Sequence, residues 1–320
     1  MSASVLESFE IMVNPVSAAA TTLVNRFRRQ RPLRGGSLLV SIFGDAIAPR
    51  GGAVTLGSLI ELAAPFGLNE RLVRTSMARL AADGWFENRR RGRLSEYRLS
   101  REGRERFAAA TQQIYAVPGQ PWPGSWTIVL VPPNSRKERQ SARDALSWAG
   151  FGEPIPGVFA HPTLPGAEID RVVRRTPHLR GAVILTTADS PTASHRRLAT
   201  LAWDLSDLAE RYRRFAAHFT PALTALADQA QRPPAQCFLL RTLLIHEYRK
   251  IHLRDPMLPA ELLPSDWVGT DAYHLCRSIY ERVAALAEQH LSAHAATLDG
   301  PLPPATAELY ARFGGLAQPR

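Results

Sequence analysis

The sequence predicts an α+β protein with three parts: an N-terminal winged helix-turn-helix domain, a middle ferredoxin-like domain and a C-terminal helical domain. Residues 55–99 follow the order helix, turn, helix and arginine-tipped hairpin. A proline- and glycine-rich linker, 116–124, separates them from alternating strand and helix patterns over 125–190. From residue 191 onward, apolar residues recur at helical spacing.

The first residues carry little apolar periodicity and end in a basic run, Arg26–Arg34. We expect residues 1–33 to form a flexible basic arm that adds phosphate contacts. The apolar segment Ser37–Ile47 is predicted to be the first helix of the winged-helix domain, which we place at residues 34–115.

Two helices and a turn follow. Thr55 is predicted to cap the first helix, which Pro65 and Gly67 end. Asn69 is predicted to cap the second helix. Its inward stripe contains Leu72, Val73, Met77 and Leu80.

The opposite face of this second helix carries Arg71, Arg74, Thr75, Ala78 and Arg79. Arginine binds guanine edges through two hydrogen bonds, or single phosphates, and a small residue permits close approach. This face, together with the capping Asn69, is therefore predicted to enter a DNA groove.

The segments Trp85–Arg90 and Leu94–Leu99 are predicted to pair as a hairpin. Its tip holds the arginines that we expect to contact phosphates or a minor groove: Arg89, Arg90, Arg91 and Arg93. A solvated basic helix and an arginine-rich surface loop are the alternative. The helix and the basic hairpin occur in the order of a winged helix, which favours DNA binding.

Positive charge is concentrated around this module. The chain has a net charge of +10, and residues 1–115 hold 17 arginines against 10 acidic residues, a net +7. Residues 116–320 contribute +3. This asymmetry is typical of polyanion-binding proteins, although proteins that bind acidic ligands or membrane surfaces share it.

The ferredoxin-like domain, 125–190, is predicted from a β-α-β-x-β order. The strands and helices expected there are Trp126–Val131, Ser135–Ala149, Gly157–Ala160, Ala167–Thr176 and Leu179–Thr187. The helical domain, 191–298, is predicted from apolar stripes at 205–219 and 233–253 and from a long final helix, Thr270–His294. Residues 299–320 are expected to be a tail, with a short helix around Ala305–Phe313.

The sequence does not support a hydrolase, a nucleotide-binding enzyme or a metal-binding protein. The sequence has no nucleophile elbow, phosphate loop or dinucleotide fingerprint, so we expect no catalytic residues and no cofactor. His290 and His294 have metal-ligand spacing, but a solvated helix face explains them better than a metal site. Cys237 and Cys276 are expected to be buried free thiols. Without a secretory pattern or an apolar run of about 20 residues, a cytoplasmic protein without membrane contact is predicted.

Several motifs together resemble the PaaX family, the repressors of phenylacetate-degradation operons. They are PLRGGSLLVSIFGDAI (32–47), NERLVRTSMARLAADGW (69–85), RGRLSEYRLS (91–100), WDL (203–205) and LRDPMLPAELLPSDWVG (253–269). The last is the most specific, because a winged helix alone fits many regulator families. The resemblance covers about Pro32–Leu298.

The resemblance implies a middle domain similar to the small Cas2 nuclease. It also implies a homodimer that binds double-stranded operator DNA and leaves it when phenylacetyl-CoA binds; a different acyl-CoA or aromatic acid is the alternative effector. Nuclease activity is not expected, because Cas2-type nucleases hold a divalent metal with an acidic residue at the end of the first strand. Trp126–Asn134 (WTIVLVPPN) has no carboxylate there.

For such an effector, Arg249, His252 and Arg254 are candidates to bind the phosphates of coenzyme A. Trp203 and Tyr212 are candidates to line an aryl pocket. The structural alternatives are an ion pair between Arg254 and Asp255, and burial of the two aromatic rings in the core, which is the more frequent role of such residues.

Overall fold

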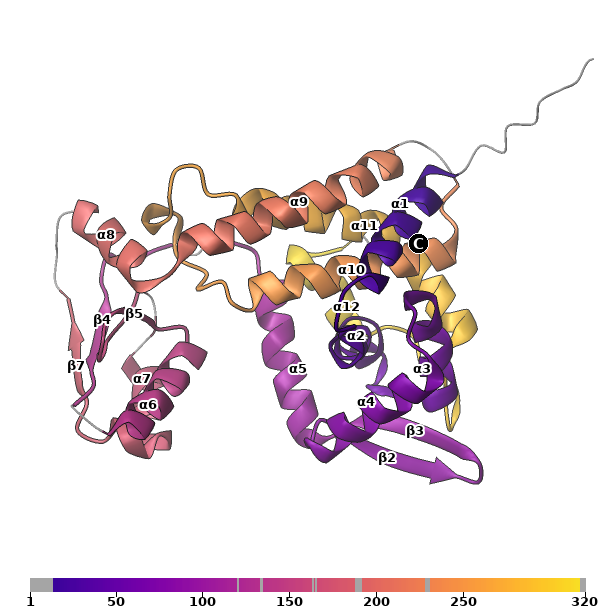
Figure 1. Ribbon diagram of the computed structural model, residues 1–320, viewed down its shortest axis with the longest axis horizontal. Helices are drawn as coiled ribbons and strands as arrows, with labels where there is room; N and C mark the ends of the chain where they lie inside the picture. Colours follow the sequence, from indigo (N-terminus) through magenta and orange to yellow (C-terminus); the bar gives the residue numbers. More distant parts are fainter. Residues whose placement is uncertain are drawn as a thin grey trace, which may run out of the picture. The chain divides into compact units, whose positions relative to one another are not determined.

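The computed structural model describes residues 14–119, 121–132, 135–162, 164, 166–187, 192–227 and 231–316 (Figure 1). They divide into two compact units, each built from separate stretches of the chain. Unit 1 combines the described part of Met1–Ala116 with Phe215–Leu253 and with the residues from Tyr273 onward. Unit 2 combines Val117–Arg214 with Arg254–Ala272.

Unit 1 begins with helix α1 (Pro15–Arg28), whose N-terminus is capped by the side chain of Asn14. Its buried face, which includes Val16, Ala20 and Phe27, packs against α10 (Pro234–His252). The flexible arm expected over residues 1–33 is therefore wrong for α1, because an apolar stripe at helical spacing buries it. Residues 1–13 lie outside the described residues.

The N-terminal part of unit 1 contains helices and strands that match the expected order. They are α2 (Gly35–Ile42), β1 (Ala53–Thr55), α3 (Leu56–Ala63), α4 (Glu70–Ala82), β2 (Phe86–Arg91), β3 (Leu94–Leu99) and α5 (Arg101–Ile114). The predicted helix Ser37–Ile47 is less regular than expected, because α2 is followed by a π-helical turn over Phe43–Ile47. The strands form an antiparallel sheet in the order β1-β3-β2.

The C-terminal part of unit 1 is built mainly from α10, the second half of α9 (Leu205–Ala227) and most of α11 (Gly269–His294). After α11 come β8 (Ala296–Thr297), β9 (Gly300–Pro301) and α12 (Ala307–Tyr310). The short helix expected around Ala305–Phe313 is α12. The segment expected to be a tail packs on unit 1 over residues 299–316, where Leu302, Leu309 and Phe313 are buried. The ring of Phe313 lies edge-on to that of Tyr115, at 5.1 Å between centroids.

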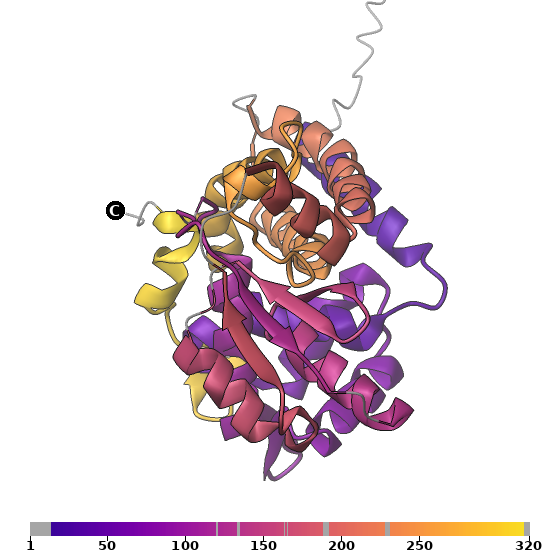
Figure 2. The same cartoon turned by 90° about the vertical axis from the view of Figure 1, so that its left-hand side faces the viewer.

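Unit 2 has the element order β-α-β-β-α-β followed by a further helix. The elements are β4 (Thr127–Leu130), α6 (Arg136–Trp148), β5 (Gly152–Ile155), β6 (Val158–His161), α7 (Gly166–Arg175), β7 (Val183–Thr186) and α8 (Thr192–Ala202). The four strands lie side by side in the antiparallel order β5-β6-β4-β7 (Figure 2). This is the element order of a ferredoxin-like domain. The predicted β-α-β-x-β pattern lacked β5.

Alternate residues of the sheet face opposite sides. Val129 and Phe159 belong to a core with Leu146 of α6 and Ile169 of α7. Ala160 belongs to a second core on the α8 side, with Trp126, Ala199 and Leu205. The helices of residues 191–298 are shared between the two units.

Cys237 and Cys276 are buried and unbridged, as predicted. Burial raises the pKa of the Cys237 thiol to about 11, which keeps it protonated near neutral pH. None of the helices in the described part of the chain combines the length and the apolar character that a membrane span needs.

Candidate nucleic-acid interface

The predicted helix caps around the turn between α3 and α4 are confirmed. The Oγ1 of Thr55 accepts a hydrogen bond from the backbone N–H of Ser58, and the Oδ1 of Asn69 accepts one from that of Leu72, at 2.8 Å. Between the two helices, Gly67 has a left-handed backbone with φ of 82°. Asn69 thus sets the first turn of α4, and its side-chain oxygen is used by the cap.

This turn is held by other parts of unit 1. Phe66 is fully buried and lies edge-on to Phe27 of α1, at 6.4 Å, and to Phe238 of α10, at 6.2 Å. Arg28 of α1 donates a hydrogen bond from Nη2 to the carbonyl oxygen of Pro65, at 2.8 Å. Helix α1 therefore supports the turn that positions α4.

Helix α4 divides into two faces as predicted. Val73 and Met77 are buried, and Leu72 and Leu80 are half-buried. The opposite face is exposed along its whole length and carries Arg71, Arg74, Thr75, Ala78 and Arg79. Solvent thus reaches three guanidinium groups on one side of a single helix.

Two of these side chains make contacts within α4. The Nε of Arg74 donates to the Oε1 of Glu70 at 2.7 Å, in an exposed ion pair one turn apart. The hydroxyl of Thr75 donates to the carbonyl oxygen of Arg71 at 2.8 Å. Such exposed pairs contribute little free energy, so Arg74 can exchange Glu70 for another anion at low cost.

The hairpin β2–β3 turns at Gly92 and Arg93, and its four tip arginines are exposed. Two of them already have an anionic partner: Arg91 donates to Asp299, and Arg89 lies 3.5 Å from the same carboxylate. Arg91 also donates to the carbonyl oxygen of Leu298. Asp299 lies in the turn of the β8–β9 hairpin, so this contact joins residues about two hundred positions apart.

A buried carboxylate attaches the same turn to the sheet. Glu96 of β3 is fully buried, and its Oε2 accepts a hydrogen bond from the backbone N–H of Leu298, at 2.7 Å. The hydrogen bond from Arg91 and the nearby charges of Arg89 and Arg98 lower the pKa of Asp299. Asp299 is therefore charged near neutral pH and offsets part of the positive charge of the hairpin. Sequence reasoning missed this pairing.

A cluster of buried charges lies inside unit 1. Asp45 accepts hydrogen bonds from Arg241 at 2.7 Å, from Arg312 at 2.9 Å, and from the hydroxyls of Tyr115 and Tyr280. Burial alone would raise the pKa of Asp45, but the two guanidinium groups and the two hydroxyls lower it below its ordinary value.

Glu288 of α11 extends this cluster by pairing with both Arg50 and Arg241. The cluster joins the segment after α2 to α10, α11 and the residues after α12. It was not predicted, although an aspartate inside the apolar segment Ser37–Ile47 is a signal that such a partner exists.

The five candidate effector residues fall in different units. In unit 1, Arg249 donates hydrogen bonds to the carbonyl oxygen of Ser37 and to the hydroxyl of Ser41, both at 2.7 Å. His252 is buried and stacks on Tyr248, at 4.7 Å between ring centroids. Both residues thus have structural contacts that join or fill the helices of unit 1.

The other three candidates, Trp203, Tyr212 and Arg254, lie in unit 2. Tyr212 is buried and donates to the Oδ2 of Asp255, at 2.7 Å. Asp255 also accepts from the backbone N–H of Met257. The loop is therefore fixed through Tyr212, while Arg254 is exposed.

No group of three or more metal-ligating side chains lies together in the part of the chain that the structure describes. His290 and His294 are neighbours on α11, with their ring centroids 4.4 Å apart. The ring of His290 also packs on Phe238, at 5.1 Å.

Comparisons with known proteins cover most of the chain. Three family models match: PaaX-like protein at residues 34–103, PaaX protein central Cas2-like domain at 119–199, and PaaX-like protein C-terminal domain at 203–293. The chain is 35% identical over 290 residues to the transcriptional repressor PaaX of Escherichia coli (strain K12), covering 89% of this chain and 92% of the relative. Among solved structures, the uncharacterized protein Rv0674 from Mycobacterium tuberculosis is 26% identical, with a TM-score of 0.46, over 72% of this chain and 89% of the other.

Proposed function

This chain belongs to the PaaX family, and we propose that it is a DNA-binding transcriptional repressor that reads its operator with α4 and the β2–β3 hairpin. The observation that carries the proposal is the exposed arginine face of α4 in the same unit as an arginine-tipped hairpin. Helices α2, α3 and α4 with the sheet β1-β3-β2 act as a winged helix-turn-helix, with α4 as the recognition helix.

The side chains divide into two roles. Arg71, Arg74 and Arg79 contact base edges and phosphates in the major groove, and Ala78 allows the helix to approach. Arg90 and Arg93 of the hairpin bind flanking phosphates. Arg89 and Arg91 join them when a phosphate replaces Asp299.

The repressor acts as a homodimer on a near-palindromic operator, because two copies of α4 then read two half-sites. The controlled operon encodes catabolism of an aromatic acid of the phenylacetate type. An aryl-CoA thioester such as phenylacetyl-CoA releases the protein, by binding preferentially to a state with weak operator affinity. A second acyl-CoA or a free aromatic acid is the alternative effector.

The proposed role is regulatory and not enzymatic. The similar protein from Escherichia coli is named a transcriptional repressor, and β4 carries no carboxylate that would serve a metal-dependent nuclease. We place this repressor in the cytoplasm.

Fluorescence anisotropy with DNA from the promoters of its own and neighbouring operons tests the DNA surface. We expect R74A/R79A to weaken specific binding by about 30-fold or more, since each of the two base contacts is worth about 1–3 kcal/mol. R101A is the matched control, because Arg101 lies at the start of α5 and is 91% exposed. Unchanged affinity of the double variant would rule out α4 as the recognition helix.

The same titration with phenylacetyl-CoA tests the effector. Release of the DNA supports a thioester-controlled repressor. Tight sequence-dependent binding that ignores the thioester would keep the DNA-binding function and reject this effector.

A further inference from the structure

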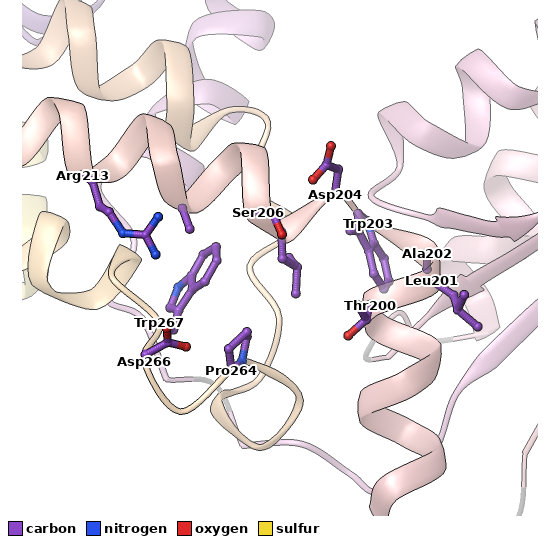
Figure 3. Close-up of a pocket in the computed structure, with 12 residues that line it drawn as sticks. Thr200, Leu201, Ala202, Trp203, Asp204, Ser206, Arg213, Pro264, Asp266 and Trp267 are labelled. Carbon is purple, nitrogen blue, oxygen red and sulfur yellow. The ribbon is translucent and has the colours of Figure 1, made fainter.

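Unit 2 contains a pocket of about 490 Å³ at the junction of α8, α9 and the loop before α11 (Figure 3). Such a volume suits a small organic ligand or a large part of one. The wall includes two tryptophans, Trp203 and Trp267, together with Ala209, Arg213 and Pro264. All lining residues belong to unit 2.

Each tryptophan is held by close packing with neighbouring residues of unit 2. A Cβ atom added to Gly152 of β5 would lie 2.6 Å from the Cε2 of Trp203, which leaves no space between strand and indole. The Trp203 ring also stacks on Trp126, at 6.1 Å and 28°. Trp203 is therefore a preformed wall, although it remains half-buried and borders the pocket.

Trp267 is held in the same manner. A Cβ atom on Gly269 would lie 2.8 Å from its Cε2, and the ring of Tyr212 packs edge-on against it at 6.0 Å. The hydroxyl of Tyr212 is in turn held by Asp255. Two rigid indoles, one from each side, thus offer stacking area without a further loss of side-chain freedom.

The charged groups of the pocket restrict what can bind. Arg213 extends from α9 toward Trp267 (Figure 3), is 52% exposed and lies 3.7 Å from the carboxylate of Glu210. Two carboxylates also line the pocket, Asp204 and Asp266, and Asp204 caps the first turn of α9. A neutral aromatic group is compatible with these carboxylates, whereas a free carboxylic acid brings a like charge close to them.

We propose that this pocket binds the aromatic acyl group of an anionic thioester. The ring packs against Trp203 and Trp267, the neutral thioester carbonyl lies among the polar groups, and Arg213 at the edge pairs with a negative group of the carrier outside the pocket. This inference rests on the proposed function, because it places the effector of that repressor.

Isothermal titration calorimetry on the full chain tests the site, with phenylacetyl-CoA, butyryl-CoA, phenylacetate and coenzyme A as probes. For the wild type we expect phenylacetyl-CoA to bind most tightly, at least ~10-fold better than butyryl-CoA, which has no ring. W203A and W267A are expected to remove this preference. W148A is the matched control, because Trp148 of unit 2 is 92% exposed and does not line the pocket.

Two further variants leave the indole packing intact, in case a tryptophan variant does not fold. R213Q should weaken phenylacetyl-CoA binding about 3- to 10-fold, and R214Q, its neighbour that also contacts Glu210, should not. S206F should fill the pocket from the first turn of α9 and abolish binding.

The outcomes separate the two proposals. If the wild type binds phenylacetyl-CoA and every pocket variant matches it, the pocket assignment is wrong while the effector stands. If phenylacetate binds with the same dependence on the tryptophans and the thioester does not, the thioester class is wrong. If neither probe binds, both the effector and the site are overturned, while operator binding is still judged by the anisotropy titration.

Discussion

At the scale of single residues, Asp45 is the carboxylate at the centre of the buried charge cluster of unit 1. It faces two buried guanidinium groups and two buried hydroxyls. An aspartate in this position is costly to bury alone but is compensated by these partners. The cluster stabilises unit 1 only when all its ions are present, because removal of one ion leaves the others buried without their counter-charge.

We therefore expect D45N to lower the free energy of unfolding by about 3–5 kcal/mol, because Arg241 and Arg312 would lose their shared anion. Urea unfolding followed by circular dichroism measures this. E70Q is the control, since Glu70 is 60% exposed in its pair with Arg74 and should change stability by less than about 1 kcal/mol. Equal effects of the two variants would contradict the role assigned to Asp45.

His161 of β6 makes the stability of unit 2 dependent on pH. Burial lowers the pKa of His161 from 6.5 to about 4, and its Nδ1 accepts a hydrogen bond from the backbone N–H of Leu164. Above pH 6.5 the imidazole is neutral in both folded and unfolded chains, so its full contribution is present there. Between pH 6.5 and 4 the unfolded chain takes up the proton first, and stability falls.

In the wild type we expect the titration of His161 to lower the free energy of unfolding by about 2 kcal/mol between pH 7 and pH 5. H161N keeps an acceptor for Leu164 but does not titrate, so urea unfolding of this variant should depend less on pH. His246, whose pKa is also lowered, is present in both proteins and cancels in the comparison. Parallel pH profiles would show that His161 titrates normally in the folded chain.

Local signals at this scale were predictable. Thr55 and Asn69 were identified as caps because a side-chain oxygen before an apolar repeat has a local partner. The exposed face of α4 followed from spacing alone. The pairing of Asp45 with Arg312 was not predictable, because the two residues are 267 positions apart and no local pattern joins them.

At the scale of elements, the turn of the β8–β9 hairpin pairs with two of the four arginines at the tip of the β2–β3 hairpin. Asp299 occupies Arg89 and Arg91, whereas Arg90 and Arg93 face solvent without that carboxylate. If the hairpin binds DNA as we propose, phosphates compete with Asp299 for two of the four tip arginines.

We expect D299N to bind DNA more tightly, chiefly to non-specific sequences, and to steepen the dependence of log K on log salt by about one to two units. Anisotropy titrations at several salt concentrations measure both quantities. E308Q makes the same change in net charge at an exposed site of α12 and serves as control. If E308Q steepens the slope equally, the overall charge explains the effect and the contacts of Asp299 with Arg89 and Arg91 do not.

Element prediction succeeded where periodicity was strong and failed at edges. The β2–β3 hairpin was predicted from alternation and the glycine at its turn. Strand β5 was missed because it is short, contains Pro154 and has an irregular register with β6, all features of an edge strand. Helix α1 is not predicted because its basic C-terminal end, Arg26–Arg28, is typical of a solvated arm. Its short apolar stripe gives a weaker signal.

At the scale of the whole molecule, the order along the chain differs from the division in space. A linear sequence suggests successive domains, yet unit 1 takes residues from three stretches and unit 2 from two. One boundary falls between Ala116 and Val117, at the start of the linker expected over 116–124. The others fall within helices α9 and α11 or just after α10. Helical periodicity continues through the boundaries in α9 and α11, so the sequence does not mark them.

This organisation predicts that residues 1–116 alone do not form a stable DNA-binding domain. The fragment lacks α10, Glu288 and Arg312, so Asp45 and Arg50 lose their partners and the apolar faces of α1 and α2 lose their cover. We expect poor dispersion of amide signals in a proton–nitrogen NMR spectrum and no specific operator binding. The full chain is the control, and a well-dispersed, operator-binding fragment would contradict the prediction.

The contact between Asp45 and Arg312 also has a consequence for synthesis on the ribosome. Asp45 is translated 267 positions before its partner, so the charge cluster closes only after Arg312 has left the exit tunnel. A message cut short upstream of that arginine yields a polypeptide in which Asp45 lacks one of its guanidinium partners. Such interrupted products are left as poorly folded substrates for proteases.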